Sequence, residues 1–76
     1  MKSINISLDS IEKVKKFVNT IAACDGDFDL SSDRYVIDAK SIMGIFSLDL
    51  SKKLRLDIHN DGIADKVIAG LQEYVV

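Results

Sequence analysis

The chain has no proline, no tryptophan, four glycines and a single cysteine, Cys24, among its 76 residues. One cysteine cannot form an internal disulfide, and a lone thiol is typical of proteins in a reducing cytosol. A hydrophobic content of 47% and the lack of low-complexity tracts argue against disorder. Because a chain this short buries only about 60% of its unfolded surface, we expect one domain with one small core, residues 1–76.

The sequence also lacks long apolar runs and an excess of positive charge. No run approaches the roughly 18 apolar residues that a membrane span needs, and the N-terminus has no signal-peptide pattern. The net charge of -2 gives no general attraction for a polyanion, so direct contact with nucleic acid is not expected. These absences predict a cytoplasmic protein with no membrane partner.

Residue types that carry catalysis or bind metals are sparse. His59 is the only histidine, and it is too far from Cys24 in the sequence to form a recognisable metal-ligand spacing. The acidic pairs at positions 25/27 and 57/61 fall at expected turns and strand ends, where capping and solvation explain them. No glycine-rich phosphate loop or nucleophile elbow occurs. We therefore expect no enzyme activity, no metal and no cofactor.

The hydrophobic pattern changes period along the chain. Alternating apolar residues predict half-buried strands, which we expect at residues 3–8, 28–30, 35–39 and 54–59. Residues 31–34 read as the polar turn of a hairpin. Apolar residues at i, i+3 and i+4 predict helices over 10–23 and 63–75, with Asp9 and Glu12 at capping-box spacing before the first. Gly26 suits the left-handed conformation that follows a helix end.

A third, shorter helix is expected after Ser41, so the order is β-α-β-β-α-β-α. Strands that are half apolar need one covered face, and each helix has one apolar stripe to bury. This predicts an α+β fold, with a four-stranded antiparallel sheet and three helices on one face. The ferredoxin-like split βαβ fold has nearly the same element order and stays open on this ground alone.

Residues 38–48 are the one segment that points to a function. Ser41 occupies an expected helix N-cap, where its hydroxyl can accept a hydrogen bond from a free amide of the first turn. A phosphate there would meet the same amides and the positive helix end. Serine is nevertheless common at N-caps, and the position alone needs no function. The apolar residues after it are too many for one face of a short helix, so some should remain exposed.

Residues 40–45, Lys-Ser-Ile-Met-Gly-Ile, resemble the helix of HPr, the histidine-containing phosphocarrier of the sugar phosphotransferase system. In that family this helix carries a regulatory phosphoserine, so the resemblance implies phosphorylation at Ser41. It also favours the HPr-like open-faced β-sandwich over the split βαβ fold. By the same motif Ile42, Met43 and Phe46 correspond to the partner-docking surface of the family, whereas Ile45 and Leu48 are expected in the core.

The sequence departs from HPr where the family carries its phosphorylated histidine. HPr proteins have a motif close to Gly-Leu-His-Ala-Arg-Pro-Ala at the start of the first helix. Alignment on Phe17-Val18 puts Ser10 at the histidine, Glu12 at the arginine and Lys13 at the proline. A serine phosphate ester does not transfer readily, and Glu12 would repel an incoming phosphate. This departure argues against phosphocarrier activity and leaves Ser10 as a capping residue.

A small basic face is expected on the first helix, from Lys13, Lys15 and Lys16, with Lys2 and Lys40 as possible neighbours. A solvated helix face is the ordinary explanation. The HPr resemblance instead implies contact with acidic partner surfaces, where such lysines would raise association rates. Together the motif and this face give the expected partner-binding residues, which are Ser10, Lys13, Lys40, Ile42, Met43 and Phe46.

The resemblance implies a regulatory or adaptor protein of the phosphotransferase system that acts through Ser41 and is not a histidine phosphocarrier. It is similar to the HPr paralogue of catabolite repression, which keeps the serine, lacks the histidine and assists a transcription factor. The alternative is a diverged component that docks on phosphotransferase proteins without phosphoryl turnover. The implied partners are an HPr kinase-type enzyme, a transcriptional regulator or phosphotransferase enzyme I. The sequence leaves the oligomeric state open.

Overall fold

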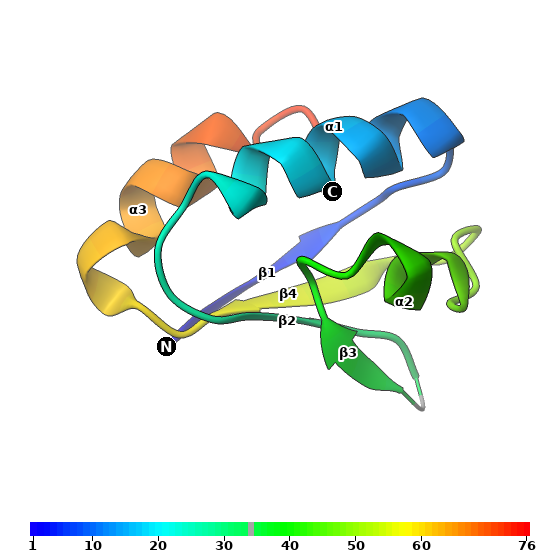
Figure 1. Cartoon of the computed structure of the whole chain (residues 1–76), viewed down its shortest axis with the longest axis horizontal. Helices are drawn as coiled ribbons and strands as arrows, with labels where there is room; N and C mark the ends of the chain where they lie inside the picture. Colours follow the sequence, from blue (N-terminus) through cyan, green and yellow to red (C-terminus); the bar gives the residue numbers. More distant parts are fainter. Residues whose placement is uncertain (34) are drawn as a thin grey trace.

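A computed structural model describes residues 1–33 and 35–76, which form seven helices and strands (Figure 1). Along the chain these are β1 (Lys2–Ile6), α1 (Ile11–Ala22), β2 (Phe28–Ser31), β3 (Val36–Asp38), α2 (Ile42–Phe46), β4 (Leu54–Ile58) and α3 (Asp61–Gly70). This order confirms the predicted β-α-β-β-α-β-α arrangement. Position 34, in the predicted hairpin turn, lies outside the described residues.

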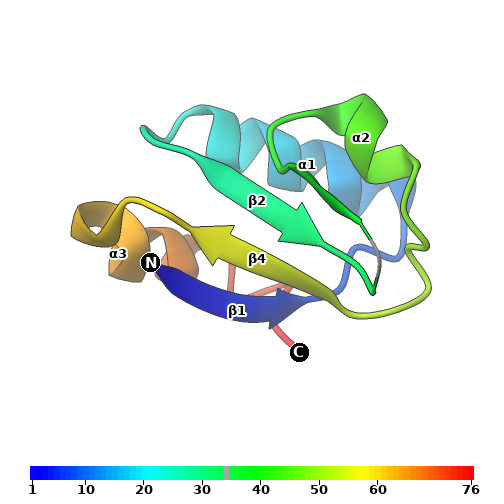
Figure 2. The ribbon, with the colours of Figure 1, turned by 90° about the horizontal axis from the view of Figure 1, so that it is seen from below.

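The four strands form one antiparallel sheet in the order β1-β4-β2-β3. All three helices lie on one side of it, with α1 and α3 side by side and α2 over the end near β3 (Figure 1). Seen from below, the strands lie in front of the helices (Figure 2). We call this uncovered side the open face. The predicted α+β fold, with three helices on one face of a four-stranded sheet, is therefore confirmed.

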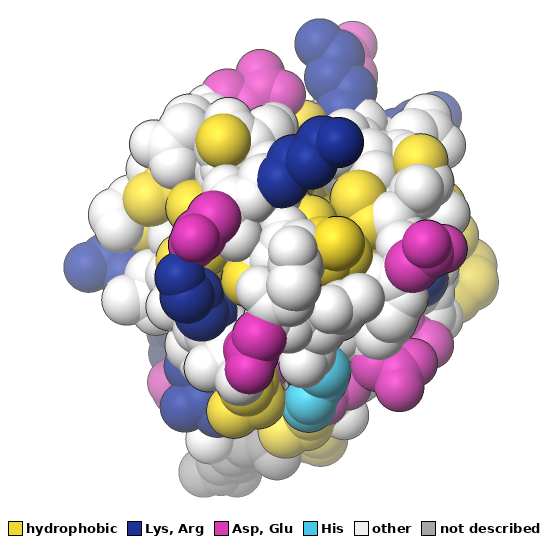
Figure 3. Space-filling view, turned by 90° about the vertical axis from the view of Figure 1, so that its left-hand side faces the viewer, with side chains coloured by type: hydrophobic (Ala, Val, Ile, Leu, Met, Phe, Trp, Pro, Cys, Tyr) yellow, Lys and Arg dark blue, Asp and Glu magenta, His cyan; other side chains and the backbone are white. Residues whose placement is uncertain are grey.

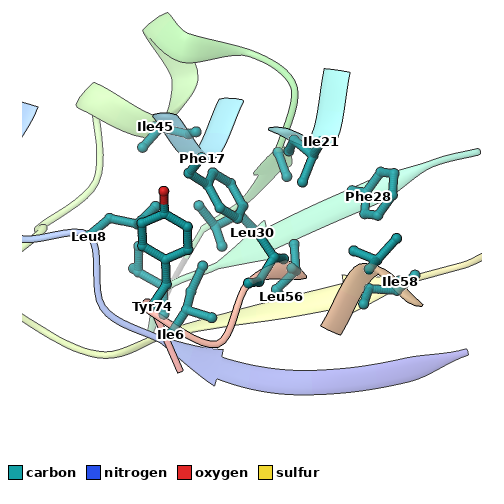
Figure 4. Close-up of a cluster of buried hydrophobic side chains, with 14 of the residues drawn as sticks. Ile6, Leu8, Phe17, Ile21, Phe28, Leu30, Ile45, Leu56, Ile58 and Tyr74 are labelled. Carbon is teal, nitrogen blue, oxygen red and sulfur yellow. The ribbon is translucent and has the colours of Figure 1, made fainter. Parts of the chain in front are cut away.

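The core lies between the sheet and the helices (Figure 4). Alternate residues of β2 and β4 point into it, and the side chains of Phe28, Leu30, Leu56 and Ile58 are at most 1% exposed. From above, α1 contributes its buried residues Val14, Phe17 and Ile21. The alternation that predicted these strands therefore follows from one face packing against helices and the other facing solvent.

The first helix begins one residue later than a capping box at Asp9 would require. Ser10 is its N-cap, with an extended backbone and a hydroxyl that accepts a hydrogen bond from the amide of Lys13 at 3.1 Å. Two residues of the predicted apolar stripe are exposed, since Ile11 is 62% exposed and Ala22 also faces solvent. Gly26 has a φ of +95°, which confirms the predicted left-handed position after the helix.

The last helix is shorter than predicted, because α3 ends at Gly70 and the stripe up to Val75 is not one helix. The chain instead turns back along β1, where Ser7 donates its amide to the carbonyl of Tyr74 at 2.8 Å and Val75 bridges Ile6. Glycine lowers the stability of a helix, and the chain after α3 forms hydrogen bonds with the edge of β1 instead of continuing the helix. Tyr74 therefore enters the core from a turn.

Strand ends also differ from the prediction by one or two residues. The first strand ends at Ile6, so Leu8 is buried beyond it, and β3 covers only Val36–Asp38. The fourth strand stops at Ile58 and excludes His59. Among the described residues, no helix has the length and apolar character needed to cross a bilayer.

Candidate functional site

Ser41 is exposed and forms the N-cap of α2. Its backbone is extended, with φ -92° and ψ 103°, and its hydroxyl oxygen accepts a hydrogen bond from the amide of Gly44 at 3.2 Å. The predicted capping role of Ser41 is therefore confirmed. The first turn of α2 presents its free amides to the same oxygen, as the sequence pattern indicated.

The backbone around Ser41 is fixed from both sides. On the strand side, the carbonyl of Asp38 accepts the amide of Ser41 at 2.9 Å, and its carboxylate accepts the amide of Lys40 at 2.9 Å. On the helix side, α2 lies close to β3 at Gly44, where an added Cβ would lie 3.3 Å from a side-chain carbon of Ile37. The glycine of the Lys-Ser-Ile-Met-Gly-Ile motif thus allows α2 to pack on the strand before it.

Lys40 is half-buried, and its ammonium group contacts other parts of the chain. Its ammonium group donates to the backbone carbonyl of Cys24, after the end of α1, at 2.8 Å, and it lies 5.4 Å from the ring centroid of Phe28. These contacts join the segment before α2 to the end of α1 and to β2. Lys40 was predicted to bind partners through its charge, and its position shows that the charge already has partners within the chain.

The apolar residues of α2 divide between core and surface. Ile45 is fully buried and Leu48, just after the helix, is 7% exposed, which confirms both as core residues. Met43 is 77% exposed and Phe46 is 40% exposed, while Ile42 is half-buried and packs on the edge of the core. We call Ile42, Met43 and Phe46 the α2 surface. Its most exposed member is a flexible methionine, which suits an adaptable contact.

The start of α1 lies on the same side of the sheet as α2, and the two helices pack together. Ser10 is exposed but its hydroxyl caps α1, and the ammonium of Lys13 forms an ion pair with the Asp9 carboxylate at 2.9 Å. The hydrogen bond and the charge of Lys13 lower the pKa of Asp9. No imidazole occupies this end of the molecule, because the only histidine is His59, which follows β4.

His59 points outward, as predicted, and its Nε2 lies 2.7 Å from the Asp29 carboxylate on the open face. Within residues 1–33 and 35–76, no group of three or more histidine, cysteine or acidic side chains is arranged to hold a metal ion. Cys24 is half-buried, and its thiol lies 3.5 Å from the carbonyl of Thr20.

The site therefore offers an exposed hydroxyl on a rigid helix start, beside an apolar surface. In the described part of the chain, no histidine or carboxylate forms a hydrogen bond with the Ser41 hydroxyl, so the chain itself supplies no base to activate it. Any phosphoryl group would have to be delivered by another enzyme. The internal contacts of Lys40 were not evident from the sequence, because they join residues 16 positions apart.

Comparisons with known proteins agree with this architecture. The family model described as "PTS HPr component phosphorylation site" matches residues 12–76. Ser10, which the alignment on Phe17-Val18 predicts at the family histidine, lies before that range. Comparison with curated proteins finds no match.

The structure is similar to the crystal structure of HPr-C-His from Thermoanaerobacter tengcongensis, with a TM-score of 0.77 and 28% sequence identity. This similarity covers 96% of the present chain and 92% of the other. HPr is a phosphocarrier protein of sugar transport and not an enzyme, and proteins of its family are cytoplasmic and interact with phosphotransferase enzymes. Since the family model covers most of its length and the folds agree, the chain belongs to the HPr family of the phosphotransferase system.

Proposed function

We propose that this HPr-family protein is a regulatory or adaptor module that acts through Ser41 and the α2 surface and does not carry phosphoryl groups on a histidine. The main support is the contrast between the start of α2 and the start of α1. Ser41 is exposed at the start of α2 within the Lys-Ser-Ile-Met-Gly-Ile motif, whereas alignment on Phe17-Val18 puts Ser10 and Glu12 at the family histidine and arginine. In this respect the chain is similar to the HPr paralogue of catabolite repression.

A phosphate on Ser41 would be tolerated by the fold. It would add about -1.5 to -2 charges and three acceptor oxygens. The amide of Gly44 already points at this side chain, and the positive end of a helix favours negative charge. The phosphate would change the charge beside the exposed side chains of Met43 and Phe46. A partner with arginines at its interface would then bind better and an acidic partner worse.

The proposal predicts that an ATP-dependent kinase of the HPr kinase type modifies Ser41. Mass spectrometry after incubation with the kinase and ATP should show one phosphate on the wild-type protein and none on Ser41→Ala. Ser47→Ala is the matched control, because Ser47 lies at the other end of the same helix and donates its hydroxyl to the carbonyl of Gly44. If the kinase leaves the wild type unmodified, Ser41 is only a helix cap.

A second candidate is a diverged component that docks on phosphotransferase proteins without turnover. The exposed α2 surface favours it, since that surface is present whether or not Ser41 is modified. Partners captured from a lysate separate the two proposals. A transcriptional regulator bound by the phosphorylated protein supports the regulatory function, whereas enzyme I bound equally by wild type and Ser41→Ala supports the second.

A further inference from the structure

The open face carries acidic side chains from three neighbouring strands in one row. Asp29 on β2 is directly opposite Asp57 on β4 and also directly opposite Asp38 on β3. Like charges directly opposite each other on neighbouring strands destabilise a sheet. The row therefore costs folding free energy wherever its carboxylates are not neutralised by neighbouring groups.

The three carboxylates of this row differ in how well neighbouring groups neutralise their charge. Asp57 is 6% exposed and is well paired, because the Ser3 hydroxyl donates to it at 2.6 Å and Arg55 Nε lies 3.1 Å from it. Asp29 has the His59 imidazole at 2.7 Å. Asp38 is exposed and accepts only a backbone amide, and no described side chain forms an ion pair with it. Among the described residues, Asp38 on β3 is therefore the least neutralised carboxylate of the row.

A shallow recess lies at the less neutralised end of the row. It has a volume of about 320 Å³ and is lined by Asp27, Phe28, Asp29, Asp38 and His59. Figure 3 shows the histidine and neighbouring acidic side chains reaching the surface at the lower part of that view. Among the described residues, these side chains are not arranged as a metal-ligand group.

Next to the acidic row, two apolar side chains are exposed on the open face. Val36 is 67% exposed and Tyr35 is 62% exposed, and Val36 precedes Asp38 by two residues on the same face of β3. Ser31 lies opposite Val36, and its hydroxyl is buried without a hydrogen-bond partner among the described residues. Together with Arg55 and Lys53, these residues line a second recess of about 450 Å³. An apolar contact and an acidic contact thus lie about 7 Å apart, the spacing of residues i and i+2 in a strand.

We propose that the open face docks an extended, positively charged protein segment. An arginine or lysine of the segment would sit between Asp29 and Asp38, and an apolar side chain two residues away would cover Val36 and Tyr35. Arginine fits best, because its planar fork can bond two carboxylates at once. Relief of the repulsion between Asp29 and Asp38 adds to the charge complementarity of such a complex. This surface lies on the side of the sheet opposite α2, and it does not depend on the phosphorylation of Ser41.

The test is a titration of the isotope-labelled full chain with an eight-residue peptide that alternates leucine and arginine, followed by amide chemical shifts. The proposal expects saturable shifts at Asp29, Val36, Asp38 and His59. The variant Asp29→Asn/Asp38→Asn keeps the shapes and the acceptor oxygens and should weaken binding about tenfold. A peptide with glutamate in place of arginine should not bind.

The matched control is Asp65→Asn/Glu73→Gln, which removes the same charge from α3 and the segment after it. It should change the dissociation constant less than about twofold, since these side chains lie away from the open face. Equal weakening by both variants would mean general electrostatic attraction and would overturn the proposal. Shifts confined to α1 and α2, no saturable binding, or the same shifts with calcium chloride alone would also overturn it.

The folding of the test variant separates docking from structure. Because the substitutions remove like-charge repulsion, the melting temperature of Asp29→Asn/Asp38→Asn should equal or exceed that of the wild type. If the double variant is less stable, Asp38→Asn alone is used, since Asp38 has no described ion-pair partner to lose. Wild-type affinity for the peptide in that single variant would contradict the proposed position of the arginine.

Discussion

At the scale of single residues, Tyr74 places a polar group in the core. It is 2% exposed and its ring packs edge-on against Phe17, with 5.9 Å between ring centroids. Its hydroxyl is buried and forms no hydrogen bond in the described part of the chain (Figure 4), although the Glu73 carboxylate is near enough to raise its pKa. A buried hydroxyl without a partner costs about 1–3 kcal/mol.

The Tyr74→Phe variant should therefore be as stable as the wild type or more stable by up to about 1 kcal/mol, because it removes the hydroxyl and keeps the ring. Urea unfolding measures this difference. Tyr35→Phe is the control, since Tyr35 is 62% exposed and should change the free energy of unfolding by less than about 0.5 kcal/mol. A clear loss of stability in Tyr74→Phe would show that the hydroxyl does make a stabilising hydrogen bond.

The same residue predicts how stability depends on alkaline pH. Burial raises the pKa of Tyr74 to about 12, and the Glu73 carboxylate adds to the shift. In the unfolded chain a tyrosine loses its proton near pH 10. The stabilising contribution is therefore complete below about pH 10 and is lost as the pH rises from there toward 12. Melting temperatures of wild type and Tyr74→Phe, measured in parallel from pH 9 to 12, should show the steeper fall in the wild type.

Lys40 is predicted to stabilise the fold rather than to bind partners. Lys40→Met removes both the hydrogen bond to the Cys24 carbonyl and the cation over Phe28, and should cost about 1–2 kcal/mol of unfolding free energy. Lys15→Met, on the exposed side of α1, is the control and should change it by less than about 0.5 kcal/mol. If urea unfolding finds the two variants equal, the ammonium of Lys40 is free for a partner.

At the scale of elements, α2 has a core side and an exposed side. Ile45→Ala should cost about 2–5 kcal/mol, because Ile45 is fully buried. Phe46→Ala should cost less than about 1.5 kcal/mol, because 40% of its side chain is exposed, but should weaken the binding of any partner that uses the α2 surface. Urea unfolding and partner affinity must be measured on the same two variants. A loss of roughly 3 kcal/mol or more in Phe46→Ala would make Phe46 a core residue.

Elements with a strong local signal could be predicted from the sequence. The alternation at 54–58 and the serine before α2 gave β4 and the N-cap, since both depend on neighbouring residues. The end of α3 could not be predicted, because the pairing of Val75 with Ile6 joins opposite ends of the chain. Contacts between residues distant in the sequence also could not be predicted. One buries Asp57 beside Ser3 and Arg55 in the sheet, and another joins the Lys40 ammonium to the Cys24 carbonyl.

At the scale of the whole molecule, the one-sided arrangement of helices gives the protein two separate surfaces. The helix side presents Ser41 and the α2 surface beside the start of α1, and the other side is the open face of the sheet. The two sides differ in chemistry as well as in place, because one presents Met43 and Phe46 beside a serine and the other presents a row of aspartates. A sheet between them allows two partners to bind without contact with each other.

The whole molecule is also the scale at which phosphocarrier activity can be tested. We predict that enzyme I and labelled phosphoenolpyruvate leave this protein unlabelled, because Ser10 is a capping residue and Glu12 brings negative charge where a phosphoryl group would arrive. Ser10→His alone should not restore transfer, since Glu12 remains, whereas Ser10→His/Glu12→Arg supplies both the nucleophile and the cation and is the informative positive control. Acid-labile label on the wild-type protein would contradict the prediction. His59→Gln would then show whether the open-face histidine accepts the phosphoryl group, since it is the only imidazole in the chain.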